Sequence, residues 1–471
     1  MSERVHFIGI CGTAMATLAA MLKRRGLDVR GSDHNVYPPM SDFLRGEGIR
    51  LLDGYDAAHI TSDIDSVVVG NAISRGNPEL EEVLDRKIRF RSLPEAIRDH
   101  FLWNARSIVI AGTHGKTTTT ALTGWLLAMN GRDPSVLVGG IATNFDGSYR
   151  LGGGRDFVIE GDEYDSAFFD KTAKFLKYLP DIAVIGNLEY DHADIYADME
   201  ALRTAFRRLV ALVPRNGRLI LGADSPEAMR LRGQARCAVE TFGLANDADW
   251  RASEIQPDRE GVAFELTVRG ERLGHARLPL FGSHNVHNAL AAFAAASAAG
   301  LSVSEMVAAA AAFKGVRRRL ELRGEAAGVS VYDDFAHHPT AIYETLRAVR
   351  WSRPDGRLWA IFEPRSATSC RRVFQADFAR AFEGSGADEI VLAPVFRATL
   401  PDAERLSIDE LVSHLTAAGK KARQFPSVED IVEAVADEAR AGDLVVIMSN
   451  GGFDGIHDKL LARLRAGRKG A

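Results

Sequence analysis

The chain has 471 residues, more than one hydrophobic core usually accommodates, so several domains are expected. Its 58 Lys and Arg residues against 63 Asp and Glu residues give a formal net charge of −5, which argues against a nucleic-acid-binding protein that depends on neutralising phosphates. No stretch approaches the ~18 uncharged apolar residues of a membrane span, and the first residues resemble a strand rather than a signal peptide. Three scattered cysteines fit neither a disulfide framework nor a zinc site. These features predict a multidomain cytoplasmic protein.

The N-terminal residues alternate short apolar runs with helix-like stretches. A strand at 5–10 leads through a glycine turn into a helix that ends near Arg25, and a second strand leads to Asp33. A further apolar run follows at 66–70. Alternation of strand and helix is typical of a parallel α/β sheet. We therefore expect a Rossmann-like domain over residues 1–105.

The remainder of the chain predicts two further α/β domains. The central one, 106–316, combines strands, an antiparallel meander at 261–280 and an Ala-rich helix at 289–299. The last one, 317–471, is predicted to be Rossmann-like. The strands expected in these two domains are 108–111, 157–159, 182–185, 218–221, 329–332, 358–362, 389–392 and 444–448. The predicted fold is thus α/β, with a central P-loop ATPase-type domain between two Rossmann-like domains.

The strongest chemical signal is a glycine loop that directly follows a predicted strand and precedes a helix. Its residues are Gly112, Thr113, His114, Gly115, Lys116, Thr117 and Thr118. Successive backbone N–H groups in such a loop can surround a polyphosphate, and the helix N-terminus adds positive potential. Lys116 would reach the β- and γ-phosphates, and the Thr117 hydroxyl would bind Mg²⁺. The full Walker pattern has glycine where Ile110 stands, so the loop is a variant, and a plain turn is the alternative.

Two acidic segments follow other strands. Residues 160–165 place four carboxylates close together, and they repel one another unless a cation or solvent neutralises them. A divalent ion with oxygen ligands is one interpretation, and a solvated loop is the other. Asp191 and His192 come after a later strand. The imidazole of His192 could bind a metal, although a structural histidine is the alternative.

Four more groups have both a functional and a structural interpretation. Asn288 could read a nucleotide base or cap the Ala-rich helix. Arg319 belongs to a run of three arginines that could clamp a phosphate or form a solvated face. Asp334 or Asp333 could bind ribose hydroxyls, and capping of a helix is the alternative. The Gly12 turn, with Asp33 some twenty residues later, imitates a dinucleotide fingerprint, but the spacing is wrong for NAD and any diphosphate would suit it.

Taken together, these motifs resemble the Mur ligase family, which builds the peptide stem of peptidoglycan precursors. The similarity covers nearly the whole chain and follows that family's order of motifs. The motifs that carry the similarity are the glycine loop at 112–117, Glu163, Asp191-His192, His284-Asn285 with Asn288, Arg318-Arg319, and Asp333-Asp334 with His337-His338-Pro339. The segments 9–13, 363–366 and 449–453 resemble the members that join a preformed tripeptide to UDP-N-acetylmuramate more than those that add L-alanine.

The resemblance implies an ATP- and Mg²⁺-dependent ligase that forms a C–N bond through an acyl phosphate during peptidoglycan recycling. The substrates would be UDP-N-acetylmuramate and the tripeptide L-alanyl-γ-D-glutamyl-meso-diaminopimelate, with no nucleic acid, membrane or obligate protein partner. The alternatives are the L-alanine-adding ligase, a regulatory P-loop ATPase and a nicotinamide oxidoreductase. Some members carry a carbamylated lysine after the Asp-His pair, but arginines stand there in this chain and the feature is not carried over.

The resemblance also assigns roles to individual residues. Lys116, Glu163 and His192 would be catalytic. Mg²⁺ would be bound by Thr117, Glu163 and His192. Besides the glycine loop, the residues around ATP would be Asn288, Arg319 and Asp334. The residues that bind the two other substrates would be Gly12, Asp33, Arg365 and Asn450.

Overall fold

The computed structural model describes residues 2–34, 36–37, 39–396 and 400–467. They form two compact units, and each unit is assembled from separate stretches of chain. The first comprises Met1–Leu188, Glu200–Trp250 and Ala291–Ala309, and the second comprises Glu189–Met199, Arg251–Leu290 and Ala310–Ala471. Strands and helices alternate in both, which confirms the predicted α/β class. None of the helices in the described residues is long and apolar enough to cross a bilayer.

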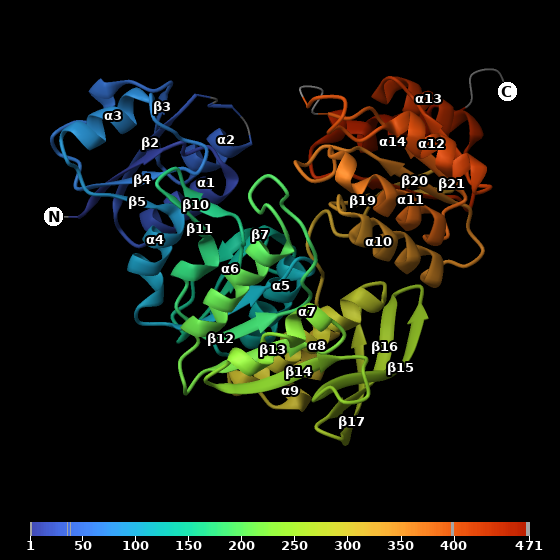
Figure 1. Cartoon of the computed structure of the whole chain (residues 1–471), viewed down its shortest axis with the longest axis horizontal. Helices are drawn as coiled ribbons and strands as arrows, with labels where there is room; N and C mark the ends of the chain where they lie inside the picture. The colour runs from blue at the N-terminus through green and yellow to red at the C-terminus, as the bar shows by residue number, and fades with distance from the viewer. Residues whose placement is uncertain (1, 35, 38, 397–399, 468–471) are drawn as a thin grey trace. The chain divides into compact units, whose positions relative to one another are not determined.

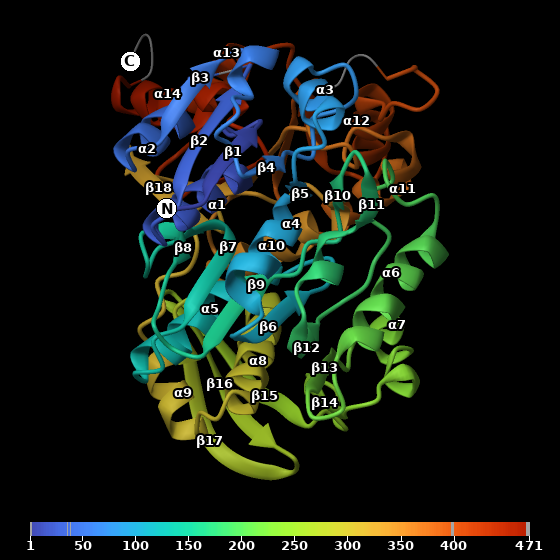
Figure 2. The same ribbon diagram turned by 90° about the vertical axis from the view of Figure 1, so that its left-hand side faces the viewer.

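The first unit begins with a parallel sheet in the order β3-β2-β1-β4-β5 (Figures 1 and 2). Because β1 is flanked by β2 on one side and β4 on the other, the chain reverses its direction of travel across the sheet at β1. Ligands of such sheets bind at the carboxyl ends of the strands beside this switch point, where the Gly12 turn follows β1. The elements are β1 (Arg4–Ile8), α1 (Thr13–Arg24), β2 (Asp28–Asp33), α2 (Met40–Gly46), β3 (Arg50–Asp53), β4 (Ser66–Val69), α3 (Pro78–Asp85), β5 (Phe90–Ser92) and α4 (Leu93–Ile97).

A second sheet of the first unit carries the glycine loop. Its strands in this unit have the order β14-β13-β12-β6-β9-β7-β8, and they are parallel except for the β7–β8 pair. The strands are β6 (Arg106–Ala111), β7 (Ser135–Ala142), β8 (Gly147–Arg150), β9 (Asp156–Glu160), β12 (Pro180–Ile185), β13 (Arg218–Gly222) and β14 (Ala238–Gly243), with a hairpin β10 (Asp165–Ala167) and β11 (Asp170–Ala173). The helices are α5 (Lys116–Met129), α6 (Met199–Leu212) and α7 (Pro226–Met229).

Residues from much later in the chain complete this part of the first unit. The end of α8 (Ser283–Ala298) and most of α9 (Val303–Ala310) lie within residues 291–309, which belong to the first unit. Trp125 on α5 donates its indole N–H to the carbonyl of Ala309, at 2.9 Å. The guanidinium of Arg106 donates to the carbonyl of Ala299, at 2.7 Å. The glycine-loop sheet is therefore covered by chain from residues 291–309.

The second unit contains a meander and a second Rossmann-like sheet. Strands β16 (Gly261–Val268) and β17 (Glu271–Leu278) pair antiparallel after β15 (Trp250–Asp258), as the alternation at 261–280 predicts. The other sheet has the order β18-β19-β23-β20-β21-β22 and is parallel except for β18–β19. Its strands are β18 (Glu321–Ala326), β19 (Val329–Asp334), β20 (Leu358–Phe362), β21 (Glu389–Leu392), β22 (Lys421–Gln424) and β23 (Leu444–Met448).

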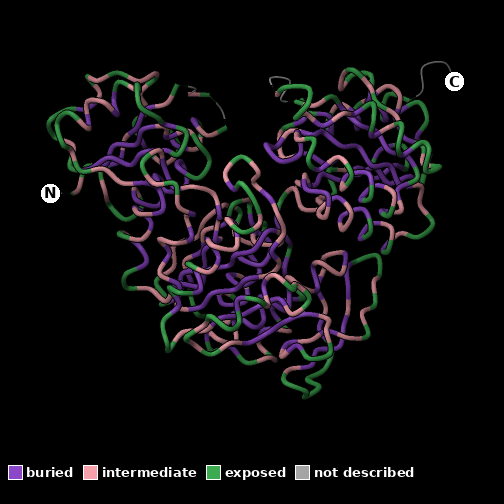
Figure 3. Tube along the Cα trace, in the orientation of Figure 1, coloured by how far each residue is buried: buried purple, intermediate pink, exposed green. Residues whose placement is uncertain are grey.

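Helices cover both faces of this parallel sheet. One apolar cluster joins the sheet to α10 (Pro339–Ser352), α11 (Gln375–Gly384) and α12 (Ile408–Ala417). Another cluster joins the opposite face to α13 (Val428–Glu438) and α14 (Ile456–Arg465). The central strands are consequently buried along their whole length (Figure 3). Parallel strands that are covered on both faces consist of continuous apolar runs, so these strands were recognisable in the sequence.

One predicted boundary is wrong. The Ala-rich helix was expected to start at Ala289, but α8 starts at Ser283 and includes the Asn288 motif as helical residues. Gly282, with a φ of +89°, lies directly before it. No Gly or Pro separates this motif from the alanines, so the helix extends back through it.

Candidate functional site

The glycine loop has a backbone that only glycine adopts readily. The loop begins after β6 ends at Ala111 and finishes where α5 begins at Lys116. Gly112 has a φ of +127° and Gly115 a φ of +79°, values that side chains disfavour. A Cβ atom on Gly112 would also lie 3.1 Å from the carbonyl oxygen of Asn187. The predicted strand–loop–helix order is thus confirmed, and both glycines are needed for its shape.

Asn187, just after β12, braces the loop from the neighbouring strand. Its carbonyl oxygen accepts a hydrogen bond from the Thr113 N–H at 2.8 Å. Its side-chain Oδ1 accepts one from the His114 N–H at 3.0 Å. No role was predicted for Asn187, although an Asn two residues after the end of a parallel strand is a signal that could have been used. The end of β12 therefore fixes the loop on one side.

Lys116 folds back over the loop and pairs with a buried carboxylate. Its Nζ donates to the carbonyl of Gly112 at 2.8 Å and lies 2.8 Å from Oε2 of Glu163. The side chains of Lys116 and Glu163 are only 13% and 2% exposed. Burial opposes the charge on Lys116, but the Glu163 carboxylate raises its pKa above the ordinary value. The structure therefore holds a positively charged ammonium at the loop.

Oxygen donors converge beside this lysine. The Thr117 hydroxyl donates to Oε1 of Glu160 at 3.1 Å, and the backbone N–H of Gly139 donates to Oε2 of the same carboxylate at 2.8 Å. Glu160 is the last residue of β9, and the sequence assigned it only to an acidic segment. A hydroxyl beside carboxylates is the donor set that Mg²⁺ prefers, so Thr117 and Glu163 fit the predicted ion and Glu160 is a further candidate ligand.

Asp162, in the same acidic segment, is neutralised within the protein. Lys174 donates to its Oδ2 at 2.6 Å. Burial would raise the pKa of Asp162, but the Lys174 ammonium holds that pKa below the ordinary value. The acidic segment thus has three lysine partners, Lys116, Lys171 and Lys174, and is not simply a solvated loop.

The Gly12 turn and Asp33 come together at the carboxyl edge of the first sheet. Gly12 is the N-cap of α1, and the backbone N–H of Cys11 donates to Oδ2 of Asp33 at 2.8 Å. The Tyr55 hydroxyl donates to Oδ1 of Asp33 at 3.4 Å. The aspartate therefore shapes the turn that the sequence associates with a diphosphate.

In the second unit, Asp191 orders the backbone at His192. Oδ1 of Asp191 accepts hydrogen bonds from the Thr368 hydroxyl and from the His192 N–H, each at 2.6 Å. Burial opposes its charge, but His192 and other imidazoles hold the pKa of Asp191 below the ordinary value. His192 has a φ of +56°, which this bonding stabilises. Because His192 belongs to the second unit, its sharing of an ion with Thr117 and Glu163 stays a prediction.

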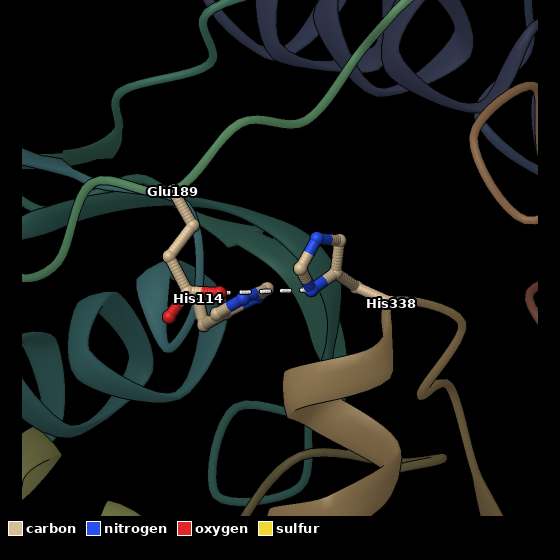
Figure 4. A group of neighbouring side chains, drawn as sticks. All are labelled: His114, Glu189 and His338. Carbon is tan, nitrogen blue, oxygen red and sulfur yellow. Dashed lines mark ion pairs between the residues drawn. The ribbon is translucent and has the colours of Figure 1, made fainter. Parts of the chain in front are cut away.

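Figure 4 shows two polar side chains of the second unit that point toward one another, Glu189 and His338. Nδ1 of His338 lies 3.7 Å from Oε2 of Glu189, which also accepts a hydrogen bond from the Thr340 hydroxyl at 2.5 Å. His338 is the N-cap of α10. The same figure draws His114, which is part of the glycine loop of the first unit. No role was predicted for Glu189, and His338 was named only as part of the motif at 333–339.

The residues predicted to surround ATP in the second unit have structural partners. Asp334 accepts hydrogen bonds from the backbone N–H groups of Leu320 and Ala336, at 2.7 and 2.8 Å. Burial raises the pKa of this carboxyl group. The guanidinium of Arg319 lies 5.2 Å from the ring centre of Phe335. Asn288, inside α8, donates to the side chain of Asn285 at 3.0 Å. Their contacts with a nucleotide stay a prediction.

The residues predicted to meet the peptide lie at the carboxyl ends of β20 and β23. The guanidinium of Arg365 stacks 3.6 Å from the ring centre of Phe396. The Ser449 hydroxyl donates to Oε2 of Glu363 at 2.5 Å, which joins the two strand ends. Among the described residues, the buried Oδ1 of Asn450 has no hydrogen-bond partner. An unpaired buried acceptor at this edge is available for a ligand.

A glycine loop with a charged lysine, set between a parallel strand and a helix beside acidic strand ends, defines a nucleotide-binding α/β protein of the P-loop type. Known proteins make the assignment more specific. Residues 4–102 match the Mur ligase family, catalytic domain, residues 110–296 the Mur ligase middle domain, and residues 318–451 the Mur ligase, glutamate ligase domain. The chain belongs to the Mur ligase family.

Relatives and solved structures extend over nearly the whole chain. The UDP-N-acetylmuramate–L-alanyl-γ-D-glutamyl-meso-2,6-diaminoheptandioate ligase of Escherichia coli is 41% identical, over 97% of both chains. The UDP-N-acetylmuramate–L-alanine ligase of Salinibacter ruber is 36% identical, over 95% of this chain and 92% of its own. The crystal structure of a murein peptide ligase from Psychrobacter arcticus is 37% identical and superposes with a TM-score of 0.72, covering 99% of this chain and 100% of its own.

Proposed function

We propose that this protein is an ATP-dependent ligase that joins L-alanyl-γ-D-glutamyl-meso-diaminopimelate to UDP-N-acetylmuramate through an acyl phosphate. The observation that carries the proposal is the 41% identity, over 97% of both chains, to the E. coli ligase named for those two substrates. Such a reaction returns a preformed peptide to a nucleotide-linked precursor, as expected in peptidoglycan recycling. Both substrates and ATP are cytoplasmic metabolites, so we place the protein in the cytoplasm.

In this proposal the first step takes place at the glycine loop. The residues of the loop from Gly112 to Thr118 hold the ATP phosphates. The carboxylate of the muramic acid attacks the γ-phosphorus, the bond between this phosphorus and the β–γ bridging oxygen breaks, and ADP leaves. The pre-aimed ammonium of Lys116 offsets charge on the transferred phosphoryl. Its charged state in the protein supports that role, since no proton has to be taken up on binding.

Mg²⁺ would be held by oxygen donors beside the loop. Thr117 and Glu163 would be two of its ligands and His192 a third, with ATP completing the coordination. The ion would neutralise charge on the phosphates. The contact of the Thr117 hydroxyl with Glu160 supports Thr117 as a ligand, because the hydroxyl that hydrogen-bonds the carboxylate can instead face a cation.

The second step forms the amide bond. The free amine of the peptide attacks the acyl phosphate, and phosphate leaves from a tetrahedral intermediate. Water must be excluded in both steps, or the acyl phosphate is hydrolysed. We assign ATP contacts outside the loop to Asn288, Arg319 and Asp334.

The two other substrates are assigned to the first and the last of the three predicted domains. The UDP part would lie at Gly12 and Asp33, and the peptide at Arg365 and Asn450. The three successive ranges that match Mur ligase domains support a division into domains at 1–105, 106–316 and 317–471. The switch point of the first sheet supports the first assignment.

The deciding experiment compares two acceptors at saturating ATP and UDP-N-acetylmuramate. A guanidinium such as that of Arg365 can bind a distal carboxylate of the tripeptide, which free L-alanine lacks. One such bond contributes about 1.5–3 kcal/mol, so kcat/KM should favour the tripeptide by roughly ten- to over a hundred-fold. Mass spectrometry identifies the joined product. Equal or better use of L-alanine would instead assign the biosynthetic step, and ADP release without a joined product would indicate a regulatory ATPase.

A further inference from the structure

A carboxylate is completely buried in the N-terminal sheet region of the first unit, among polar partners. The Glu79 side chain is 0% exposed. Its Oε2 accepts hydrogen bonds from the Ser32 hydroxyl at 2.5 Å and lies 3.0 Å from Nε2 of His6. Its Oε1 lies 2.7 Å from Nδ1 of His59 and accepts the Asp56 N–H at 3.4 Å. All the partners of Glu79 thus come from other elements of the same sheet region.

Two of these contacts, those with Ser32 and Asp56, lead to the edge of the sheet where the Gly12 turn lies. Ser32 precedes Asp33 at the end of β2, and its carbonyl accepts the N–H groups of Gly9 and Ile10, at 2.9 and 3.0 Å. Ser32 therefore holds the turn by its backbone while its hydroxyl is held by Glu79.

The second segment held by Glu79 also leads to Asp33. Asp56 directly follows Tyr55, whose hydroxyl donates to Oδ1 of Asp33. One buried carboxylate consequently fixes two backbone segments, one ending in Asp33 and the other carrying the hydroxyl that contacts it. Glu79 itself is fixed at the start of α3, where Asn77 caps the helix and the helix dipole favours an anion.

A purely structural role does not account for a charge in this place. Burying a carboxylate carries a desolvation penalty, and an apolar side chain of similar volume often stabilises such a position at least as well. Burial would raise the pKa of Glu79, but hydrogen bonds from His6 and Ser32 hold that pKa below the ordinary value, so the group stays ionised. Unlike an apolar residue, the carboxylate holds the polar groups of its four partners in fixed orientations through hydrogen bonds.

We propose that Glu79 is a positioning residue of the UDP site: by holding Ser32 and Asp56 it presets the Gly12 turn, Asp33 and Tyr55 for the diphosphate and sugar of the nucleotide substrate. The proposal rests on the function proposed above. It assigns Glu79 no contact with the substrate. Its effect is confined to binding at the first sheet and does not extend to phosphoryl transfer at Lys116.

The test uses Glu79→Gln in the full chain, with Glu82→Gln on the same helix as the matched control. Glu82 is a partly exposed carboxylate that contacts Arg86 on its own helix. In Glu79→Gln, KM for UDP-N-acetylmuramate should rise about tenfold or more, the scale expected when binding groups shift by a fraction of an ångström to an ångström. Neither KM for ATP nor kcat at saturating nucleotide sugar should change more than about twofold. Glu82→Gln should match the parent protein.

Direct binding separates this proposal from the proposed function. If the parent protein fails to bind UDP-N-acetylmuramate in calorimetry, the proposed function is wrong. If the parent binds it and folded Glu79→Gln binds equally well, Glu79 has no positioning role. A rise in KM for ATP by the same factor, or a fall in kcat alone, would also overturn it. Should Glu79→Gln not fold, Ser32→Ala decides, since it removes one of the links and should weaken nucleotide-sugar binding selectively.

Discussion

Removing the charge of Lys116 should affect stability and catalysis separately. At a separation of 2.8 Å between Nζ and Oε2 of Glu163, two unit charges attract by about 6 kcal/mol at an effective dielectric constant of ~20. Desolvation offsets much of this gain in the intact pair. In Lys116→Met the carboxylate remains buried without its cation, which should cost about 3–5 kcal/mol. For a unit of this size, the melting temperature should fall by roughly 6–20 °C.

The double variant Lys116→Met with Glu163→Gln provides the internal control. Because it removes both charges, the melting temperature should recover by at least half. Activity should not recover, because the transferred phosphoryl still lacks its pre-aimed charge, and kcat should stay at least ~10²-fold below that of the parent. Stability is measured by thermal unfolding followed by circular dichroism, and activity by product formation at saturating substrates. A single variant as stable as the parent would refute the buried pair, and a kcat within a few-fold of the parent would refute the catalytic role.

Two further predictions address the oxygen donors and the acid stability of the second unit. A Cβ on Gly139 would lie 2.9 Å from Oε2 of Glu160, so Gly139→Ala should displace that carboxylate and raise the Mg²⁺ concentration for half-maximal activity about tenfold. Gly147→Ala is the control, because the nearest atom to a Cβ there is 3.6 Å away, and its Mg²⁺ titration should match that of the parent. Identical Mg²⁺ titrations of the two variants would show that Glu160 is not a ligand. Asp443 accepts from Arg357 at 2.6 Å, and although burial opposes its charge, this bond holds its pKa below the ordinary value. The ionised carboxylate therefore stabilises the fold above about pH 4, and this stabilisation is lost as the pH falls further. Asp443→Asn should lower the free energy of unfolding by about 1.5–3 kcal/mol at pH 7, and the difference from the parent should narrow only below about pH 4. A difference that already narrows between pH 7 and pH 5 would contradict the assignment.

The sequence predicted the buried framework well because buried parallel strands consist of continuous apolar residues. The glycine loop was equally recognisable, since its glycines and lysine have a fixed spacing next to a strand. Edge strands were missed because they lack such a continuous apolar run. In β22, Lys421–Gln424, the residues are mostly polar, and only hydrogen bonds to β21 define the strand.

The parts of the site that sequence could not predict depend on side-chain direction. Glu79, Glu81 and Glu82 are equivalent in the sequence of one acidic helix, and only the packing of α3 shows that Glu79 faces inward. Asn187 was visible as a residue after a strand, but its two hydrogen bonds depend on β12 lying beside β6. The experiments above test the role assigned to Lys116, and the other residues assigned to ATP, metal and substrates remain predictions.

The way each unit is assembled from separate stretches has a consequence for synthesis on the ribosome. The first sheet, β1 to β5, is contiguous in sequence and can form as soon as about a hundred residues have emerged. The glycine-loop sheet cannot acquire its full cover at that stage, because the residues that cap Trp125 and Arg106 are Ala309 and Ala299. A nascent chain that ends before residue 291 lacks both of these hydrogen bonds, so the glycine-loop sheet reaches its final packing only after residues 291–309 have been synthesised.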